Sequence, residues 1–131
     1  MIVLDTHIWI WYLDSPELLS ERARTTVDHA RDESDILISS ISTWEVFMLE
    51  RKGRLRLRIP VLEWLRKSER LSFLHFVPVD NDIARLSVQL PEYPHQDPAN
   101  RMIIATALSL GARIVTKDHK IQDYTRVPTV W

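Results

Sequence analysis

Short apolar runs alternate along the chain with longer segments in which apolar residues recur every three or four positions. A short apolar run predicts a buried strand, whereas the longer spacing predicts one face of a helix. Pro78 cannot donate a backbone hydrogen bond, so the strand that contains it is expected at an edge of the sheet. Five strands are predicted, at residues 2–5, 36–39, 76–79 and 113–116 and in a last short segment that begins at Val127.

Helical periodicity occupies the stretches between these strands. The first strand is expected to run into a helix, residues 91–97 form a loop, and further helices are predicted over residues 17–30, 43–52, 61–70, 83–90 and 98–110, with a short turn at 119–124. Alternating strands and helices predict one domain over residues 1–131. Its fold class is α/β, a doubly wound α/β/α sandwich with a central parallel sheet. Ligands of such folds bind beyond the carboxyl ends of the strands.

Composition excludes several functions. The chain has 131 residues, of which 45% are hydrophobic, and this is enough for one packed core. It has no cysteine, which excludes disulfides and thiol catalysis and favours a cytoplasmic location. Its two glycines leave no phosphate-binding loop. The apolar N-terminal run is interrupted by Asp5 and His7 and has no basic leader, so neither a signal peptide nor a membrane span is expected.

Acidic residues follow three of the predicted strands. Asp5 ends the first strand, Glu45 lies in the helix after the second, and Asp118 follows the strand at 113–116. All three are expected at one edge of the sheet, and Asp97 joins them if the helix at 98–110 begins there. Carboxylates gathered in this way repel one another unless a cation lies between them, and Mg²⁺ or Mn²⁺ suits such oxygen ligands.

Each of these acids also has a purely structural interpretation. Ser42 and Glu45 fit a capping box, Asp97 fits a helix cap before Pro98, and Asp118 fits a cap for the turn that follows it. Taken singly, the structural interpretation is the more frequent one. The joint arrangement at one sheet edge is what favours a metal site.

Four segments resemble the signatures of PIN-domain proteins, and most of all the VapC-type toxins of type II toxin–antitoxin systems. They are MIVLDTHIWIW at 1–11, SSISTWE at 39–45, DPANRMIIATA at 97–107 and TKD at 116–118. The resemblance spans nearly the whole chain. It implies a Mg²⁺- or Mn²⁺-dependent endoribonuclease that cleaves RNA with a metal-activated water. It further implies a cognate antitoxin that silences the enzyme, and a homodimer.

The resemblance assigns Asp5, Glu45 and Asp118 to the first, second and fourth acidic positions of the family. The third position, just before the arginine of the D-P-x-D-R motif, is Asn100 here. Asp97 keeps the upstream acid, and residues three apart share a helix face, so both can point into one site. Asn100 supplies an uncharged oxygen, from which we expect weaker metal affinity than in relatives with four acids.

Several other residues are candidates for supporting roles. Ser42, Thr116 and Thr6 match small hydroxyl positions that line such sites, although Ser42 is equally well explained as a helix cap. Arg101 is expected either to contact a phosphate or to pair with a nearby acid. His7 is two residues from Asp5 and can approach the site.

A basic run and many aromatic residues complete the list of features. Arginines alternate with Leu55 and Leu57, which suggests an RNA-binding strip, although a solvated basic loop is the slightly favoured interpretation. The basic residues are Arg51, Lys52, Arg54, Arg56 and Arg58. The large aromatics either stack on bases, form core or line an antitoxin groove; they are Trp9, Trp11, Tyr12, Trp44, Phe47 and Trp64.

Two alternatives to a toxin ribonuclease remain. With Asn100 at an acidic position, the domain can be a weakly active or inactive PIN protein that mainly binds RNA or its antitoxin. A phosphoryl-transfer domain with an aspartyl nucleophile is disfavoured. His7 stands where a haloacid-dehalogenase-like enzyme needs a second acid, and the paired acids of a receiver domain are missing.

Overall fold

The computed structural model describes all 131 residues and contains one five-stranded sheet in which every pair of neighbours is parallel. The strand order is β3-β2-β1-β4-β5. The strands are β1 (Ile2–Leu4), β2 (Ile36–Ser39), β3 (Leu74–Val77), β4 (Arg113–Val115) and β5 (Thr129–Val130). The chain winds outward from β1 in one direction through β2 and β3 and in the other through β4 and β5. The predicted doubly wound α/β fold is therefore confirmed.

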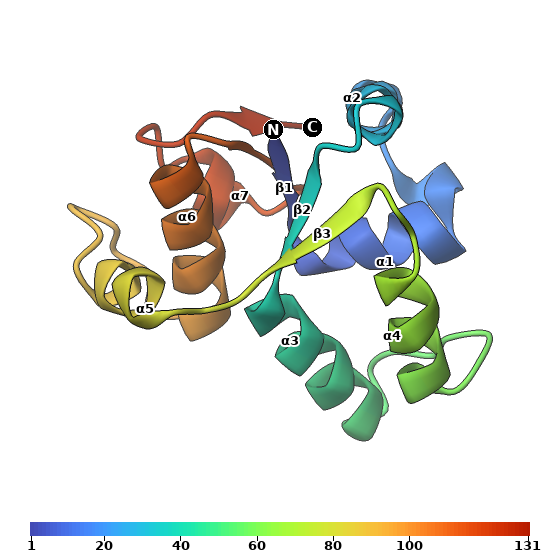
Figure 1. Ribbon diagram of the computed structural model, residues 1–131. Coiled ribbons are helices and arrows are strands. Elements are labelled where there is room, and N and C mark those ends of the chain that lie inside the picture. The colour runs from blue at the N-terminus through green and yellow to red at the C-terminus, as the bar shows by residue number, and fades with distance from the viewer.

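Helices cover both faces of this sheet (Figure 1). They are α1 (Thr6–Asp14), α2 (Glu21–Asp32), α3 (Ser40–Arg51), α4 (Val61–Glu69), α5 (Asn81–Val88), α6 (Pro98–Leu110) and α7 (His119–Gln122), with a 3-10 turn η1 at Pro16–Leu18. No helix of the structure has both the length and the apolar character needed to cross a membrane.

Strand residues divide between two cores according to the alternation of their side chains. Ile2 and Leu4 belong to a core that α1, α2 and α4 cover, whereas Val3 belongs to a second core against α6 and α7. All three side chains are at most 1% exposed. Burial on both faces explains why the strands are continuous apolar runs rather than alternating ones.

The starts of three predicted helices were wrong, and capping explains each correction. The helix predicted at 17–30 is the turn η1 followed by α2, because Ser20 caps α2 by accepting from the Ala23 N–H at 3.0 Å. The helix predicted at 83–90 begins at Asn81, because Asp80 caps it through the Ile83 N–H at 2.9 Å. The helix predicted at 43–52 begins at Ser40, with Ser39 as its cap.

The strand predicted at 76–79 lies two residues earlier, at Leu74–Val77. Pro78 has no N–H, so the ladder with β2 ends at the pair Ser39–Val77. The predicted edge position of this strand is confirmed. The helix predicted at 98–110 and the loop at 91–97 are confirmed as well.

The topology brings distant segments together at the carboxyl edge of the sheet. Helix α1 follows β1 after Asp5 alone, and α3 follows β2 without any loop. β4 pairs with β1, so the residues that follow β4 lie beside the start of α1. This edge is where the predicted acidic residues come from.

Gly111 ends α6 in the left-handed conformation, with φ of 65°, and a Cβ there would meet no atom within 4 Å. We expect Gly111→Ala to lower the free energy of unfolding by about 1 kcal/mol, because only backbone strain is added. Gly111→Asn is expected to cost less, since asparagine tolerates this conformation. Urea denaturation of both variants measures the difference, and equal costs would contradict the explanation.

Candidate active site

A cavity of about 420 Å³ opens at the carboxyl edge of the sheet. All four predicted acids line it. Its full lining is Asp5, His7, Ile8, Trp11, Glu45, Asp97, Asn100, Lys117 and Asp118. The expected convergence of acids from four segments of the chain therefore occurs in the structure.

Asp5 is the most deeply buried acid of the cavity, at 8% exposure. Its Oδ1 accepts from the Thr6 N–H at 2.8 Å and so caps α1. Its Oδ2 accepts from the hydroxyl of Thr116 at 2.6 Å, across 111 positions of sequence. Burial raises the pKa of Asp5, and the two hydrogen bonds oppose that rise only in part.

Hydroxyl groups hold Glu45 in place. The Thr6 hydroxyl donates to Glu45 Oε1 and also lies 2.8 Å from the Ser42 hydroxyl. Ser42 is fully buried inside α3, and Ser39 caps that helix, so the capping interpretation of Ser42 was wrong. The predicted role of Thr6 and Ser42 as residues that support the site fits this geometry.

Asp97 and Asp118 each cap a helix and also face the cavity. Asp97 Oδ1 accepts from the Ala99 and Asn100 N–H groups at the start of α6. Asp118 Oδ1 accepts from the Lys120 N–H at the start of α7. The structural and the functional interpretations of these acids are therefore compatible, because each cap uses Oδ1 alone and Oδ2 takes no part in it.

Asn100 at the third acidic position donates from its amide to Asp118 Oδ2 at 3.1 Å. A carboxylate accepts hydrogen bonds and donates none, so the amide nitrogen must be the atom that faces Asp118. Asn100 is 6% exposed. In this structure Asn100 acts first as a hydrogen-bond donor that positions Asp118.

None of the ion pairs in the structure involves Asp5, Glu45, Asp97 or Asp118. Burial raises the pKa of Glu45, and the neighbouring charges of the other three acids raise it further. No three of the His, Asp and Glu side chains stand close enough to form a ready-made metal cluster.

The donor set nevertheless suits a hard divalent cation. Four carboxylates and an amide supply the oxygen ligands that Mg²⁺ and Mn²⁺ prefer, and no sulfur lines the cavity to compete for the ion. A cation among them would remove the repulsion that raises the pKa of Glu45. The residues that line the cavity therefore fit the predicted metal.

Arg101 forms no ion pair in the structure, so the predicted pairing with a nearby acid is wrong, whereas its predicted phosphate contact stays a prediction. Its guanidinium donates to three backbone carbonyls, those of His95, Ser87 and Tyr93, at 2.7, 3.0 and 2.9 Å. Arg101 instead ties the loop before α6 to that helix and so positions Asp97 at the helix start.

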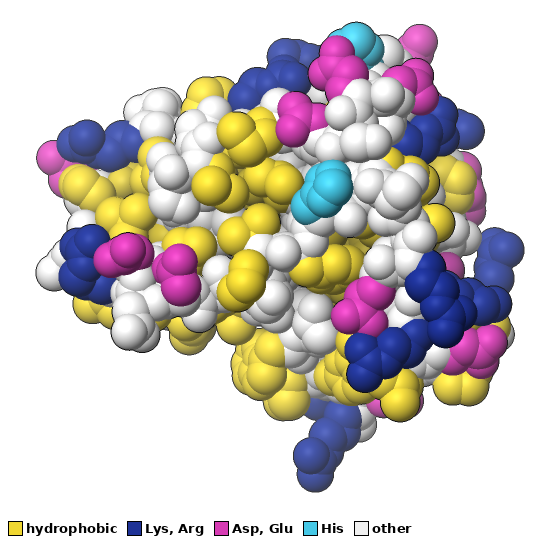
Figure 2. All heavy atoms as spheres, viewed as in Figure 1, with side chains coloured by type: hydrophobic (Ala, Val, Ile, Leu, Met, Phe, Trp, Pro, Cys, Tyr) yellow, Lys and Arg dark blue, Asp and Glu magenta, His cyan; other side chains and the backbone are white.

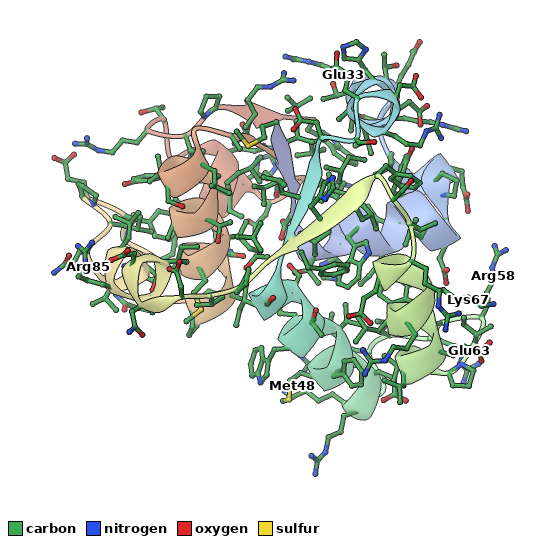
Figure 3. The ribbon with its side chains drawn as sticks, viewed as in Figure 1. Glu33, Met48, Arg58, Glu63, Lys67 and Arg85 are labelled. Atoms are coloured by element: carbon green, nitrogen blue, oxygen red, sulfur yellow. The ribbon has the colours of Figure 1, made fainter.

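The five predicted RNA-binding residues do not line the acidic cavity. Their side chains are exposed, while Leu55 and Leu57 pack on the core, as the alternation predicts. Figure 2 shows Lys and Arg side chains gathered beside α4, and Figure 3 shows Arg58 pointing away from the molecule there. A phosphate contact by this run remains a prediction.

The aromatic residues divide among the interpretations offered for them. Trp9 and Trp64 are core, with ring centroids 4.6 Å apart, and Tyr12 and Phe47 pack against the same core. Trp44 is 55% exposed on α3. Trp11 alone among them lines the cavity.

Two residues near the site escaped the sequence analysis. Lys117 lies between two recognised site residues, Thr116 and Asp118, and lines the cavity. The buried hydroxyl of Tyr93 has no hydrogen-bond partner, and its pKa is raised by burial and by the charges of Asp118 and Asp97. The position of Lys117 inside the TKD motif was a usable signal, whereas Tyr93 lies in a loop without one.

Comparison with known proteins agrees with the fold. Residues 2–127 match the PIN domain family. Ribonuclease VapC22 of Mycobacterium tuberculosis is 34% identical over 99% of this chain and 98% of its own. The fold is similar to VapBC2 from Rickettsia felis bound to a promoter DNA fragment (TM-score 0.70, 15% identity, 98% of this chain and 97% of that one). It is also similar to FitAcB from Neisseria gonorrhoeae (TM-score 0.66, 21% identity, 98% and 96%). The chain therefore belongs to the PIN domain family.

Proposed function

We propose that this protein is a Mg²⁺- or Mn²⁺-dependent endoribonuclease and the toxin of a toxin–antitoxin pair. The observation that carries the proposal is one cavity lined by four carboxylates, none of which has a basic partner. The relative named a ribonuclease, and the similar folds found in toxin–antitoxin complexes, support it.

Asp5, Glu45, Asp97 and Asp118 are the residues that would hold the cation. When bound, it supplies a polarised water and offsets the charge that develops on the phosphoryl oxygens. Hydroxyl groups orient two of the acids before the cation arrives: Thr116 holds Asp5, and Thr6 holds Glu45. This preorganisation lowers the cost of ordering the ligands.

The partners that we propose are the RNA substrate, a cognate antitoxin and a second copy of the chain. The basic run between α3 and α4 offers positive charge to the RNA backbone. Trp44 on α3 is a large exposed apolar side chain of the kind that protein partners cover.

The amide at the third acidic position favours a second candidate function. Asn100 places an uncharged amide at one position of the ligand set, and this amide donates a hydrogen bond to Asp118 Oδ2. A domain that binds its cation weakly acts mainly by binding RNA or its antitoxin. RNA binding in Mg²⁺ without cleavage even in Mn²⁺ would distinguish this candidate from the enzyme.

Asp5→Asn is expected to reduce RNA cleavage in Mg²⁺ to background while the domain stays folded, because the change keeps the side-chain volume and removes the most buried ligand charge. Chelator added to the wild type is expected to have the same effect. The measurements are gel-based RNA cleavage and circular dichroism. Asp32→Asn, on the exposed surface of α2, is the matched control. Cleavage by Asp5→Asn at the wild-type rate would contradict the proposal.

Glu45→Gln is expected to raise the free energy of unfolding of the metal-free protein, since the ionised carboxyl is disfavoured where burial and the neighbouring acids raise its pKa. The amide oxygen still accepts from Thr6. Because a raised carboxyl pKa costs stability only where the group is ionised, the gain disappears as the pH falls below the ordinary value of 4.5. Urea denaturation in chelator measures it.

In Mg²⁺ the wild type should become more stable to unfolding than Glu45→Gln, because it keeps the metal ligand that the variant lacks. Glu50→Gln, on the exposed end of the same helix, is the control and should match wild type in both conditions. A Glu45→Gln protein that is less stable than wild type in chelator would contradict the electrostatic argument.

Asn100→Asp is expected to strengthen Mn²⁺ binding about tenfold, because it adds a ligand charge. The same change should destabilise the metal-free protein, since a second carboxylate replaces the donor that lies 3.1 Å from Asp118. Isothermal titration and urea denaturation measure the two effects. Asn81→Asp, at the exposed start of α5, is the control. Unchanged Mn²⁺ affinity would show that residue 100 does not contribute to the ligand set.

A further inference from the structure

Aromatic and basic side chains line the active-site cavity beside its acids. His7, Trp11 and Lys117 also line it, and the proposed metal chemistry uses none of them. The ring centroids of His7 and Trp11 lie 5.8 Å apart. Indole, imidazole and ammonium groups are therefore gathered immediately beside the carboxylates.

Lys117 is held by aromatic rings rather than by an acid. Its Nζ lies 5.9 Å from the centroid of Trp11 and 5.6 Å from that of Trp131, and the two indoles are 6.3 Å apart. It forms no ion pair although Asp118 is its neighbour in sequence. The indoles attract the ammonium through their π faces. A positive charge is thereby positioned at the wall of an otherwise acidic cavity, where an anion can reach it.

We propose that Trp11, Lys117 and Trp131 form a nucleotide-binding subsite for an unpaired RNA residue next to the phosphate that is cleaved. The base stacks on the indole of Trp11, and Lys117 contacts a phosphate. This inference rests on the proposed ribonuclease function and adds a requirement for single-stranded RNA at the cleavage point.

The combination of groups favours a nucleotide over a protein side chain. A nucleotide presents a flat aromatic face and an anionic phosphate, which match an indole and an ammonium. Only Ile8 and Trp11 are hydrophobic among the nine residues of the cavity, so an apolar side chain would find little surface to bury. Trp44 offers more exposed indole but does not line the cavity.

The position of Trp11 inside a cavity explains why the base that stacks on it must be unpaired. Trp11 is half-buried and is reached through the cavity, whereas a base in a duplex is covered on both faces by its neighbours. Stacking on Trp11 therefore requires a base that has left the helix. Duplex RNA is left with phosphate contacts alone.

The test uses short single-stranded RNAs that carry 2-aminopurine at successive positions. The Asp5→Asn protein in Mg²⁺ keeps them intact, so binding is measured without cleavage. We expect fluorescence quenching at one position, and we expect Trp11→Leu in this background to abolish it. Trp11→Leu should raise the Kd about 5- to 100-fold, the range that loss of one base–aromatic stack produces. The Kd of Trp11→Phe should lie between those of the parent and of Trp11→Leu, and the Kd of Trp44→Leu should equal that of the parent.

Lys117→Gln should lower the dependence of log Kd on log salt by about one unit, as loss of one phosphate contact does. Lys67→Gln is the control. Lys67 is a solvated residue of α4 paired with Glu63 at 3.6 Å, as Figure 3 shows, and it does not line the cavity. Binding of a blunt-ended, fully paired RNA duplex should not change with Trp11→Leu.

Unaltered quenching and Kd in Trp11→Leu, with the parent protein binding RNA normally, would overturn the subsite and leave the proposed ribonuclease standing. That result would point to a protein partner for the indole pair. If Trp11→Leu does not fold, Trp11→Phe and the exposed Lys117→Gln decide the question, and wild-type behaviour in both overturns the subsite. A parent protein that binds no RNA would overturn both proposals.

Discussion

Repulsion among four carboxylates in one cavity is the constraint to which the surrounding structure responds. No basic side chain neutralises any of them, yet Asp5 is almost fully buried. Asp5, Asp97 and Asp118 each cap a helix, so each gives one oxygen to backbone N–H groups. A helix N-terminus carries roughly half a positive charge. The starts of three helices therefore stabilise the acids without occupying them fully, and this leaves room for a cation.

Parallel topology is what brings those helix starts together. In a doubly wound sheet every strand points its carboxyl end toward the same edge, and the chain turns there into the next helix. β1 and β4 are neighbours in the sheet although they are far apart in sequence. Thr116, directly after β4, can therefore donate to Asp5 and accept from the Asp118 N–H at 3.0 Å. One hydroxyl links two acids that the sequence separates by 113 positions (118 − 5).

The sequence predicted the ends of a helix best where a start signal and a stop signal were both present. Helix α6 was predicted at both ends because Asp97-Pro98 marks its start and Gly111 its end. The start of α3 was misplaced because three serines precede Glu45, and only the structure distinguishes Ser39 as the cap from Ser42 as a buried site residue. Strand-end acids could be placed by topology alone. The contacts of Lys117 with two indoles could not, because they depend on how β5 brings Trp131 beside Trp11.

Asn100 shows how a single amide changes the balance between the metal-free and metal-bound states. An acid at this position would add attraction for a cation, and without the cation it would add repulsion. The amide instead donates to Asp118 and holds that ligand in place. It therefore stabilises the empty site while it lowers the charge available to the ion. A cavity built in this way stays ordered before the cation binds, and its affinity for the cation depends more heavily on the three acids that match the family motif, Asp5, Glu45 and Asp118.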